Sequence, residues 1–449
     1  LNEIIYDQDG NERGKQIVLL PTGAGKSLCF LVPSLLIDGP TLILYPLLAL
    51  MSDQQRRMEE GNMDIVVFKG QQTKEQRQEN FEKLKNGAKV ILANPEVLQS
   101  EKLLEEIAKF NIKHIAIDEA HCVSEWGDTF RPAYTTVGNI IKKLGNPVVT
   151  AFTATASPTV LERISQIMFD GNAHILRSES DRPNIIYHVV KTATKEKIAL
   201  KYAELSEKPL IVFCATRKRA ENLSKTFAEY FGYDKVKFYH AGLEKSEKDK
   251  IEKWFYPKTD AILCSTCAFG MGVDKKDIRT VIHLDPPPTA ESYIQEAGRG
   301  GRDGKISNAI LLWSYENKFD SLKFSENSRE RVLHKFAETT DCRRQILLDA
   351  LGGEKTVCSG CDNCNGSSIH YANDEKIALK FIKRFNKNFS VDELETELQA
   401  LFNKINFENN KLRFWEFSDM RQIINSLLKQ EKIKVCKFPW KNKVKILSN

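Results

Sequence analysis

The chain has 449 residues, which at roughly 100–200 residues per domain suggests two to four domains, and 41% of its residues are hydrophobic. Its longest apolar run, residues 28–37, is interrupted by Pro33 and Ser34 and is too short to span a bilayer, so we expect no membrane association. No signal peptide is visible. The ten cysteines therefore favour a reducing compartment, with thiols used for metal binding or packing instead of disulfides.

The net charge of +6 is concentrated at one end of the chain. Residues 370–449 hold 16 Lys and Arg against 10 Asp and Glu, whereas residues 1–369 hold 50 of each. Within that basic tail, residues 432–445 contain six lysines and no acid, beside Phe438 and Trp440. Lysines interleaved with aromatic side chains favour an anionic polymer as the partner over an ordinary solvated surface.

The first predicted strand, residues 15–20, runs into a glycine-containing loop that opens a helix. Glycines let backbone N–H groups approach phosphate oxygens, a lysine reaches the outer phosphates, and a hydroxyl ligates Mg²⁺. Leu20 stands where the standard phosphate loop has its first glycine. The predicted nucleotide-binding residues of this loop are Thr22, Gly23, Ala24, Gly25, Lys26 and Ser27.

Strands alternate with helical patterns along most of the chain, in two series separated by a polar connector near residues 171–183. Such alternation predicts parallel sheets covered by helices on both faces. We therefore predict an α/β fold with two lobes, residues 1–172 and 173–320, of which only the first has a phosphate loop. The predicted strands are residues 41–45, 64–68, 90–93, 114–118 and 148–152 in the first lobe, and 185–190, 210–214, 236–239, 261–264, 280–284 and 309–313 in the second.

Two adjacent carboxylates, Asp118 and Glu119, end an apolar run at residues 115–117. This places them at the carboxyl edge of a buried parallel strand, where α/β sheets bind ligands. One acid can hold a phosphate-bound Mg²⁺ while the next orients an attacking water. Two acids at a strand end are also a common solvated cap, and the phosphate loop upstream is what favours the catalytic interpretation.

The second lobe offers the segment QEAGRGGRDG at residues 295–304. Its arginines, Arg299 and Arg302, are three residues apart on one helical face or its edge, from which they can reach the γ-phosphate. Surface arginines in a flexible glycine-rich turn are the alternative for this segment alone. The presence of Lys26 and the two acids favours the catalytic role.

Together these motifs resemble the RecQ family of DNA helicases in superfamily 2, whose members commonly lack the first glycine of the phosphate loop. The DEAHC sequence followed by S-x-W-G-x-x-FRP is the most family-specific feature. The resemblance implies two RecA-like lobes, then a zinc-binding helical platform at residues 321–369 and a winged-helix domain at residues 370–449. The matching segments are PTGAGKS at 21–27, PLLALMSDQ at 46–54, DEAHCVSEWG at 118–127, TATAS at 153–157, FCATRKRAENL at 213–223, YHAGLE at 239–244, STCAFGMGVDKKDIRTVIH at 265–283 and QEAGRGGRDG at 295–304.

The resemblance also implies roles for single residues around the nucleotide. Asp118 would coordinate Mg²⁺ through water, and Glu119 would position or activate the attacking water. His121, Thr153 and Thr155 would link the nucleotide state to the grip on DNA. The second lobe would complete the ATP site with Arg299 and Arg302 as arginine fingers, with Gln295 and Asp274 as further members.

The aromatic loop after the DEAH sequence would sense single-stranded DNA through Trp126, Phe130 and Arg131. Aromatic faces stack bases without regard to sequence, at about 1–3 kcal/mol each; a packed core aromatic is the alternative for Trp126. Asp128 stands where relatives often carry His, which puts coupling through that position in doubt. The glycines at 300–301 replace the family's usual residues, so we expect a looser arginine turn. Preference for ATP is inferred from the resemblance alone.

The cysteines Cys342, Cys358, Cys361 and Cys364 follow the spacing C-x15-C-x2-C-x2-C, the first on an apparent helix at residues 329–351. Four thiolates at such spacing suit a closed, tetrahedral Zn²⁺ site. Unconnected core cysteines are one alternative. An iron–sulfur cluster is another, but the knuckle spacing and the resemblance favour zinc.

The basic tail predicts three helices and a β-hairpin, which is the pattern of a winged helix. The aromatic residues Phe438 and Trp440 at the hairpin tip, flanked by lysines, would wedge against a duplex end. A protein-contact module is the alternative for this region. The predicted helices are residues 374–385, 391–401 and 417–430, and the predicted strands are 433–435 and 444–447.

We therefore expect an ATP- and Mg²⁺-dependent, zinc-containing 3′–5′ DNA helicase that acts on single-stranded and forked or tailed duplex DNA in repair and recombination. The direction comes from the resemblance. A DNA-binding scaffold with a weak or vestigial ATPase is the alternative, disfavoured by the intact phosphate loop, acids and arginines. An RNA helicase is disfavoured by the aromatic loop, the zinc platform and the wing together. We expect a monomer in the bacterial cytoplasm, associated with the nucleoid, with a single-strand-binding protein as a further partner.

Overall fold

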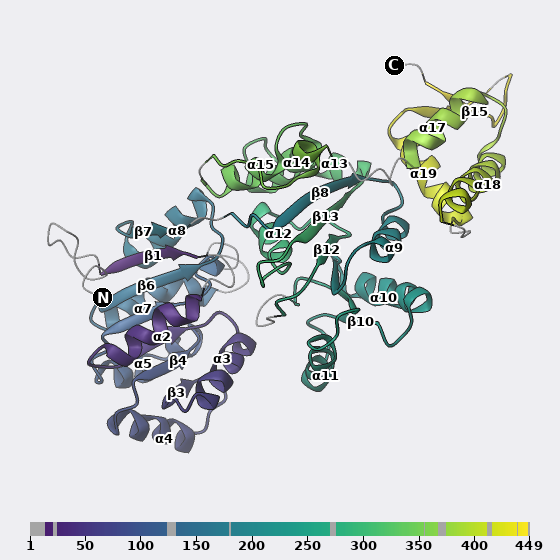
Figure 1. The fold of residues 1–449 in the computed structure, drawn as a ribbon. Helices are drawn as coiled ribbons and strands as arrows, with labels where there is room; N and C mark the ends of the chain where they lie inside the picture. Colours follow the sequence, from purple (N-terminus) through teal and green to yellow (C-terminus); the bar gives the residue numbers. More distant parts are fainter. Residues whose placement is uncertain are drawn as a thin grey trace. The chain divides into compact units, whose positions relative to one another are not determined.

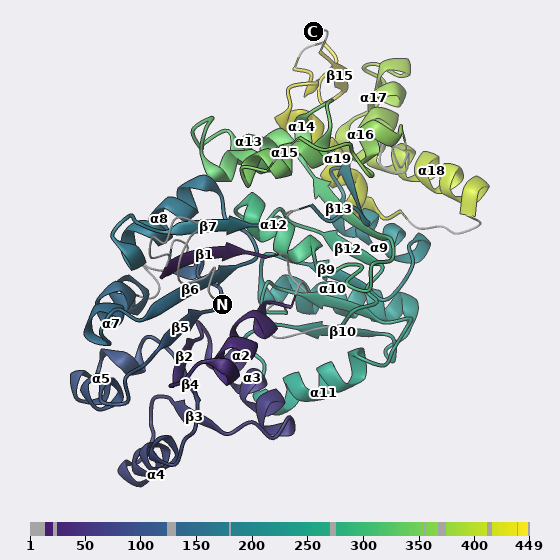
Figure 2. The same ribbon diagram turned by 60° about the vertical axis from the view of Figure 1, so that its left-hand side comes forward.

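The computed structural model describes residues 14–20, 25–123, 132–178, 181–269, 275–353, 355–366, 374–410, 415–437 and 439–447. The chain divides into two compact units, residues 1–181 with 348–355, and residues 182–347 with 356–449. Each unit is built around a sheet flanked by helices (Figures 1 and 2).

The sheet of the first unit is parallel, with the strand order β3-β4-β2-β5-β6-β1-β7. Most of its strands are short runs of Val, Ile, Leu and Ala that are buried on both faces, as is usual for parallel sheets. The predicted strands of this lobe are confirmed to within one residue at each end. The observed bounds are β1 Lys15–Leu19, β2 Thr41–Leu44, β3 Ile65–Phe68, β4 Val90–Ala93, β5 His114–Ile117, β6 Val148–Thr153 and β7 His174–Arg177.

Strand β7 was not predicted, because it lies in the interval that composition marks as a polar connector. It pairs with β1 at the edge of the sheet, and its apolar residues Ile175 and Leu176 are 44% and 42% exposed. An exposed edge strand has no continuous apolar run to reveal it. The first sheet therefore extends past residue 172, and the interpretation of residues 171–183 as a mere connector is wrong.

Helices cover both faces of the first sheet. On one face, α2 (Lys26–Leu36) and α3 (Leu48–Glu60) pack through Phe30, Met51 and Met58. The other face is covered by helices whose apolar residues form a second buried cluster. These are α4 Lys74–Lys85, α5 Glu101–Ala108, α7 Val137–Lys143 and α8 Pro158–Phe169, with the short turns η1 Val97–Gln99 and η2 Pro132–Thr136.

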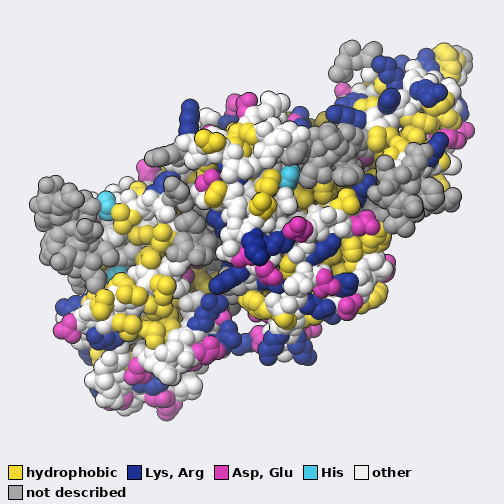
Figure 3. Space-filling model, viewed as in Figure 1, with side chains coloured by type: hydrophobic (Ala, Val, Ile, Leu, Met, Phe, Trp, Pro, Cys, Tyr) yellow, Lys and Arg dark blue, Asp and Glu magenta, His cyan; other side chains and the backbone are white. Residues whose placement is uncertain are grey.

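The outer side of α2 is apolar as well. Its residues Leu28, Val32, Leu35 and Leu36 are 50% to 66% exposed, and Figure 3 shows hydrophobic side chains gathered over this helix. The longest apolar run of the sequence is thus one helix of a lobe, with Pro33 inside it. Among the described residues, no helix combines the length and the hydropathy needed to cross a membrane.

The sheet of the second unit is also parallel, with the order β10-β11-β9-β12-β13-β8. The predicted strands are confirmed to within two residues. Helices α9 (Lys195–Leu205) and α10 (Arg217–Phe231) pack on one face, and α11 (Lys245–Phe255) packs on the other. The strands are β8 Ile185–Lys191, β9 Leu210–Phe213, β10 Val236–Tyr239, β11 Ile262–Ser265, β12 Thr280–His283 and β13 Ser307–Trp313, and helix α12 spans Ala290–Ala297.

A group of short helices follows the second sheet. The prediction of one continuous helix over residues 329–351 is wrong, because the chain leaves the helical conformation at residues 339–342. Cys342 therefore lies in a break between two helices, not within one. The elements of this group are α13 Tyr315–Ser321, η3 Arg329–Arg331, α14 Val332–Glu338, α15 Arg343–Ala350 and α16 Asp362–Asn365.

The basic tail contains the three predicted helices and the predicted antiparallel hairpin, but the second helix runs nine residues further than predicted, to Asn410. Its helices share a buried apolar cluster with α9 and α10. At the start of the tail, Asp374 accepts hydrogen bonds from the hydroxyls of Thr192 (2.6 Å) and Thr194 (3.0 Å). The tail thus packs on the second sheet's helical layer. Its elements are α17 Asp374–Arg384, α18 Val391–Asn410, α19 Phe417–Lys429, β14 Ile433–Val435 and β15 Val444–Ile446.

Candidate nucleotide and zinc sites

The carboxyl ends of β1 and β5 bring Lys26 and Glu119 together. Helix α2 begins at Lys26, directly after Gly25, whose φ of 83° is one that glycine adopts without strain. The Lys26 ammonium lies 3.2 Å from Glu119 Oε1, although 93 residues separate them. A lysine for phosphates and a carboxylate for the attacking water must share one small site in phosphoryl transfer, and these two do.

Asp118 lies buried beside Glu119. Its Oδ1 accepts a hydrogen bond from the Glu119 backbone N–H at 3.0 Å. The pKa of Asp118 is raised to about 6, mainly by burial and also by the charge of Glu119, while the charge of Lys26 opposes both effects. A carboxylate whose charged form is disfavoured in this way gains from a neighbouring cation, so the residue fits a Mg²⁺ ligand. Glu119 itself has a φ of 48°, a strained value that is typical of functional sites.

A hydrogen-bonded network links the acids to the end of β6. His121 Nδ1 lies 3.1 Å from the Thr153 hydroxyl and 3.4 Å from Glu119 Oε2. The Thr153 hydroxyl donates to the Thr155 carbonyl at 3.0 Å, so toward His121 it can only accept. The structure brings together the three residues that the sequence assigned to coupling.

The arginines of the second unit lie beyond α12 instead of on its face. Helix α12 ends at Ala297, and Arg299 and Arg302 lie in the turn that leads to β13, both partly exposed. Gln295 lies in the last turn of α12 and is also partly exposed. The expectation that both arginines lie on one helical face is therefore wrong.

The expectation of a loose arginine turn is also wrong. A Cβ added at Gly300 would lie 2.1 Å from the Ser307 Oγ, and one at Gly301 would lie 2.4 Å from the Lys305 carbonyl oxygen. Gly301 also has a φ of 56°. These glycines stand where the turn packs tightly, which leaves no room for a side chain.

Sequence reasoning missed two residues that contact this turn, Arg182 and Asn184. Both donate side-chain hydrogen bonds to its backbone carbonyls. The only signal was the tripeptide Arg-Pro-Asn directly before β8, and polar residues before a strand usually read as a solvated turn.

Four sulfur atoms converge in the second unit. The Sγ atoms of Cys342, Cys358, Cys361 and Cys364 all lie within 4.8 Å of one another. Zn–S bonds of about 2.3 Å in a tetrahedron place sulfurs roughly 3.8 Å apart, so the cluster fits zinc. The Cys361 Sγ also accepts a hydrogen bond from the Cys364 backbone N–H at 3.4 Å, which favours a thiolate at that position.

Among the residues predicted to bind DNA, the structure describes Trp440. It lies between β14 and β15, is 49% exposed, and has the Lys387 ammonium 3.9 Å from its ring centroid. A cation over an exposed ring contributes about 0.5–1 kcal/mol, and about half of the Trp440 surface stays accessible. The other predicted site residues Thr22, Gly23, Ala24, Trp126, Phe130, Arg131, Asp274 and Phe438 lie outside the described residues, as does Asp128.

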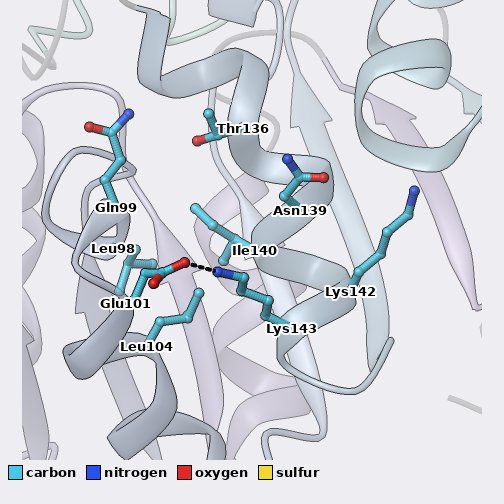
Figure 4. A pocket seen from close by; sticks show the side chains of 9 residues that line it. All are labelled: Leu98, Gln99, Glu101, Leu104, Thr136, Asn139, Ile140, Lys142 and Lys143. Atoms are coloured by element: carbon cyan, nitrogen blue, oxygen red, sulfur yellow. Dashed lines mark hydrogen bonds and ion pairs between the residues drawn. The ribbon is translucent and has the colours of Figure 1, made fainter.

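A groove of about 440 Å³ on the first unit lies apart from these residues (Figure 4). It is formed by α5, η1 and α7, with Leu104 and Ile140 at its wall and an ion pair of 2.7 Å between Lys143 and Glu101. No described residue of the predicted sites lines it. We therefore assign it no part in the chemistry.

Comparisons with known proteins agree with this geometry. Family models match residues 4–164 (DEAD/DEAH box helicase), 193–304 (helicase conserved C-terminal domain) and 317–365 (RecQ zinc-binding). The chain is 39% identical over 352 residues to "Probable ATP-dependent DNA helicase RecS" of Bacillus subtilis, covering 75% of this chain and 71% of that protein. It is 30% identical over 413 residues to the ATP-dependent DNA helicase RecQ of Pasteurella multocida, covering 88% of this chain and 65% of that protein.

Among solved structures, the DUF1998 helicase MrfA bound to DNA aligns with a TM-score of 0.58 at 16% identity, over 97% of this chain and 58% of that one, a likeness of fold alone. The two parallel sheets are thus the cores of RecA-like lobes, and the four-cysteine cluster is that of the RecQ zinc-binding domain. The chain belongs to the RecQ family of ATP-dependent DNA helicases.

Proposed function

We propose that this chain is an ATP-dependent DNA helicase that moves 3′ to 5′ on single-stranded DNA and separates duplexes in DNA repair or recombination. The observation that carries the proposal is the Lys26–Glu119 pair beside buried Asp118, in a chain whose relatives are named ATP-dependent DNA helicases. A scaffold with a vestigial ATPase has no need of this pair. The 3′–5′ direction rests on the family resemblance alone.

In the proposed mechanism, Lys26 changes partners when ATP binds. The ammonium moves from Glu119 to the outer phosphates, which frees the Glu119 carboxylate to orient the attacking water. Ser27 and Asp118 would hold Mg²⁺, which neutralises phosphate charge when it is bound. His121 contacts both Glu119 and Thr153, so it is placed to pass this change on to the segment after β6.

The second lobe supplies the remaining charge stabilisation. Arg299 and Arg302 act on the γ-phosphate of the same nucleotide, where a positive guanidinium offsets the charge that develops in the transition state. Gln295 and Asp274 are further members of the proposed nucleotide site.

DNA is held by aromatic and basic side chains. Trp126, Phe130 and Arg131 form the proposed sensor of single-stranded DNA. Helices α17–α19 and the hairpin form a proposed winged helix at residues 370–449, in which Trp440 and Phe438 meet the duplex end. Support comes from the half-exposed Trp440 ring, from the Lys387 ammonium beside it and from the lysines near it in the sequence.

We keep the proposed division into two lobes, a zinc domain at 321–369 and a winged helix, with the boundary between the lobes moved to residue 181. Single-stranded and forked or tailed duplex DNA are the proposed partners. A monomeric state, a single-strand-binding protein as partner and association with the nucleoid are further proposals.

The test is strand separation of matched duplexes with a 3′ tail, a 5′ tail or blunt ends, with ATP and Mg²⁺. We expect separation of the 3′-tailed duplex only, and its loss in Lys26→Ala. DNA binding without separation of any duplex would favour the scaffold, and separation from a 5′ tail alone would reverse the proposed direction.

A further inference from the structure

The turn that carries Arg299 and Arg302 is held by a third arginine. Arg182 Nη2 donates to the carbonyl oxygens of Gly300 (3.1 Å) and Gly301 (2.9 Å), and Nη1 lies 3.4 Å from that of Gly298. These three carbonyls belong to the peptide units just before Arg299, between Gly300 and Gly301, and just before Arg302. One planar guanidinium thus fixes the backbone from which both arginines project, a task for which a lysine lacks the fork of donors.

Asn184, two residues after Arg182 in the sequence, also binds the turn. Its Nδ2 donates to the carbonyls of Gly301 (2.7 Å) and Lys305 (2.8 Å). The Gly301 backbone N–H donates in turn to the Ile278 carbonyl at 2.8 Å. The turn is therefore tied to the segments that precede β8 and β12, at the amino edge of the second sheet.

Arg182 is itself held from the zinc domain. Arg344, only 1% exposed, donates through Nη1 to the Arg182 carbonyl at 3.0 Å, and through Nη2 to the Ile185 carbonyl and to the Gly360 carbonyl at 3.3 Å. Its guanidinium also lies over the Tyr187 ring, 5.1 Å from the centroid. Gly360 directly precedes Cys361, so an unbroken series of hydrogen bonds joins the cysteine cluster to the arginine turn.

We infer that Arg182 is a positioning residue for ATP hydrolysis. It fixes the positions of Arg299 and Arg302, and it is connected through Arg344 to Gly360, which precedes Cys361 of the cysteine cluster. The inference rests on the proposed function, because it requires the arginine pair to act on ATP. Arg182 acts through the turn and not on the phosphates. A misplacement of a catalytic group by about 1 Å can cost on the order of 100-fold in rate, so this positioning has a measurable consequence.

The test compares Arg182→Lys, Arg299→Ala and the double variant with the unmodified chain. Steady-state ATP hydrolysis with saturating single-stranded DNA gives kcat and KM; zinc content and Tm report on the fold. Arg331→Lys is the matched control, because Arg331 also donates to a backbone carbonyl, that of Ser321, but does so away from the turn.

We expect Arg182→Lys to lower kcat about 10- to 100-fold with little change in the KM for ATP, because the phosphate-binding lobe is untouched. Zinc content and Tm should stay near those of the control. The double variant should be slower than Arg299→Ala alone by less than the fold loss caused by Arg182→Lys in the unmodified chain, since only Arg302 is then left to be misplaced.

The inference would be overturned if Arg299→Ala is slow but Arg182→Lys has the kcat of the unmodified chain. It would also be overturned if the fold loss of kcat in the double variant equals the product of the losses in the two single variants. A wild-type kcat in Arg299→Ala would instead remove the arginine pair from the proposed function. Should Arg182→Lys not accumulate as folded protein, Asn184→Ala is the second variant: a several-fold loss of kcat supports the positioning of the turn, and an unchanged kcat contradicts it.

Discussion

The two lobes share a fold, but the residues of the proposed chemistry lie at opposite edges of their sheets. In the first lobe, Lys26, Glu119 and Thr153 follow or end the strands β1, β5 and β6, which are neighbours in the sheet order, so their side chains meet at the carboxyl edge. In the second lobe, Arg299 and Arg302 lie in the turn before β13, at the amino edge.

This difference shows how each site depends on the rest of the chain. The first site is held by contacts among loops of one sheet. The second is held by Arg182 and Asn184, and through Arg344 by the zinc domain, with contacts between residues 116 to 162 apart in the sequence. Damage to the zinc domain should therefore reach the second lobe's arginines before it reaches the first lobe's phosphate loop.

Removal of zinc should have the largest effect, and it should affect the second lobe more than the first. Cys361→Ser should lose the metal and most of its soluble yield, because structural zinc contributes folding free energy directly, about 10–16 kcal/mol in small zinc-finger peptides. The soluble remainder should still bind ATP through the first lobe. Metal analysis and a fluorescent ATP analogue measure both, with Cys436→Ser as the control outside the cluster. A wild-type chain that is stripped of metal and stays fully stable would contradict the zinc assignment.

The second-largest effect is expected from a substitution that changes the first lobe alone. Glu119→Gln should bind ATP normally but lose roughly 10²–10⁴-fold in kcat, since the neutral amide cannot accept a proton from water. Lys26 also loses its charged partner, so affinity for ATP should rise if it changes. Single-turnover hydrolysis beside equilibrium binding measures this, with the partly exposed Glu106→Gln as the control. Normal hydrolysis in Glu119→Gln would remove this residue from its proposed role.

A smaller effect is expected in the basic tail, which contains none of the proposed catalytic residues. Trp440→Ala should weaken binding to forked DNA by about 1–3 kcal/mol, roughly 5- to 150-fold, because one stacking face is lost. ATP hydrolysis stimulated by single-stranded DNA should stay within about twofold. Fluorescence anisotropy with forked and single-stranded DNA tests this, with the exposed Tyr233→Ala as the control. Equal weakening on both DNAs would argue against a place at the duplex end.

The smallest effect is a shift in pH dependence. The pKa of Asp118 is raised to about 6, mainly by burial, so hydrolysis should fall as the pH drops through about 6 and this carboxylate takes up a proton. Mg²⁺ competes with that proton, so a tenfold rise in free Mg²⁺ should move the midpoint down by at most about one pH unit. If the midpoint of the pH profile does not change with the Mg²⁺ concentration, Asp118 does not bind the metal.

The sequence predicted the sheets well because their strands are short Val, Ile and Leu runs between turn residues, as in residues 90–93. It missed β7 because that strand is exposed at an edge. It placed Cys342 inside a helix because the helical pattern continues on both sides of the break. Motifs located Lys26, Glu119 and the cysteines, since each of these combines a residue type with a fixed spacing.

The supports of the arginine turn could not be predicted in this way. Whether Gly300 and Gly301 loosen a turn or fit a tight one depends on Ser307 and Lys305, whose approach only the fold reveals. Arg344 is buried and Arg299 partly exposed, yet a single sequence gives no sign of this difference. Because α/β sheets usually bind ligands at the carboxyl edge, we would also have expected the second site at that edge, whereas its arginines lie at the amino edge.

The central claim is that the first lobe's pair and the second lobe's arginines serve one ATP-driven motor. The most direct measurement is ATP hydrolysis with and without single-stranded DNA, beside separation of a 3′-tailed duplex, for the unmodified chain, Lys26→Ala and Arg299→Ala. We predict strong stimulation by DNA together with strand separation in the unmodified chain, and the loss of both in either variant. DNA binding without stimulated hydrolysis in the unmodified chain, or normal strand separation in Arg299→Ala, would contradict the claim.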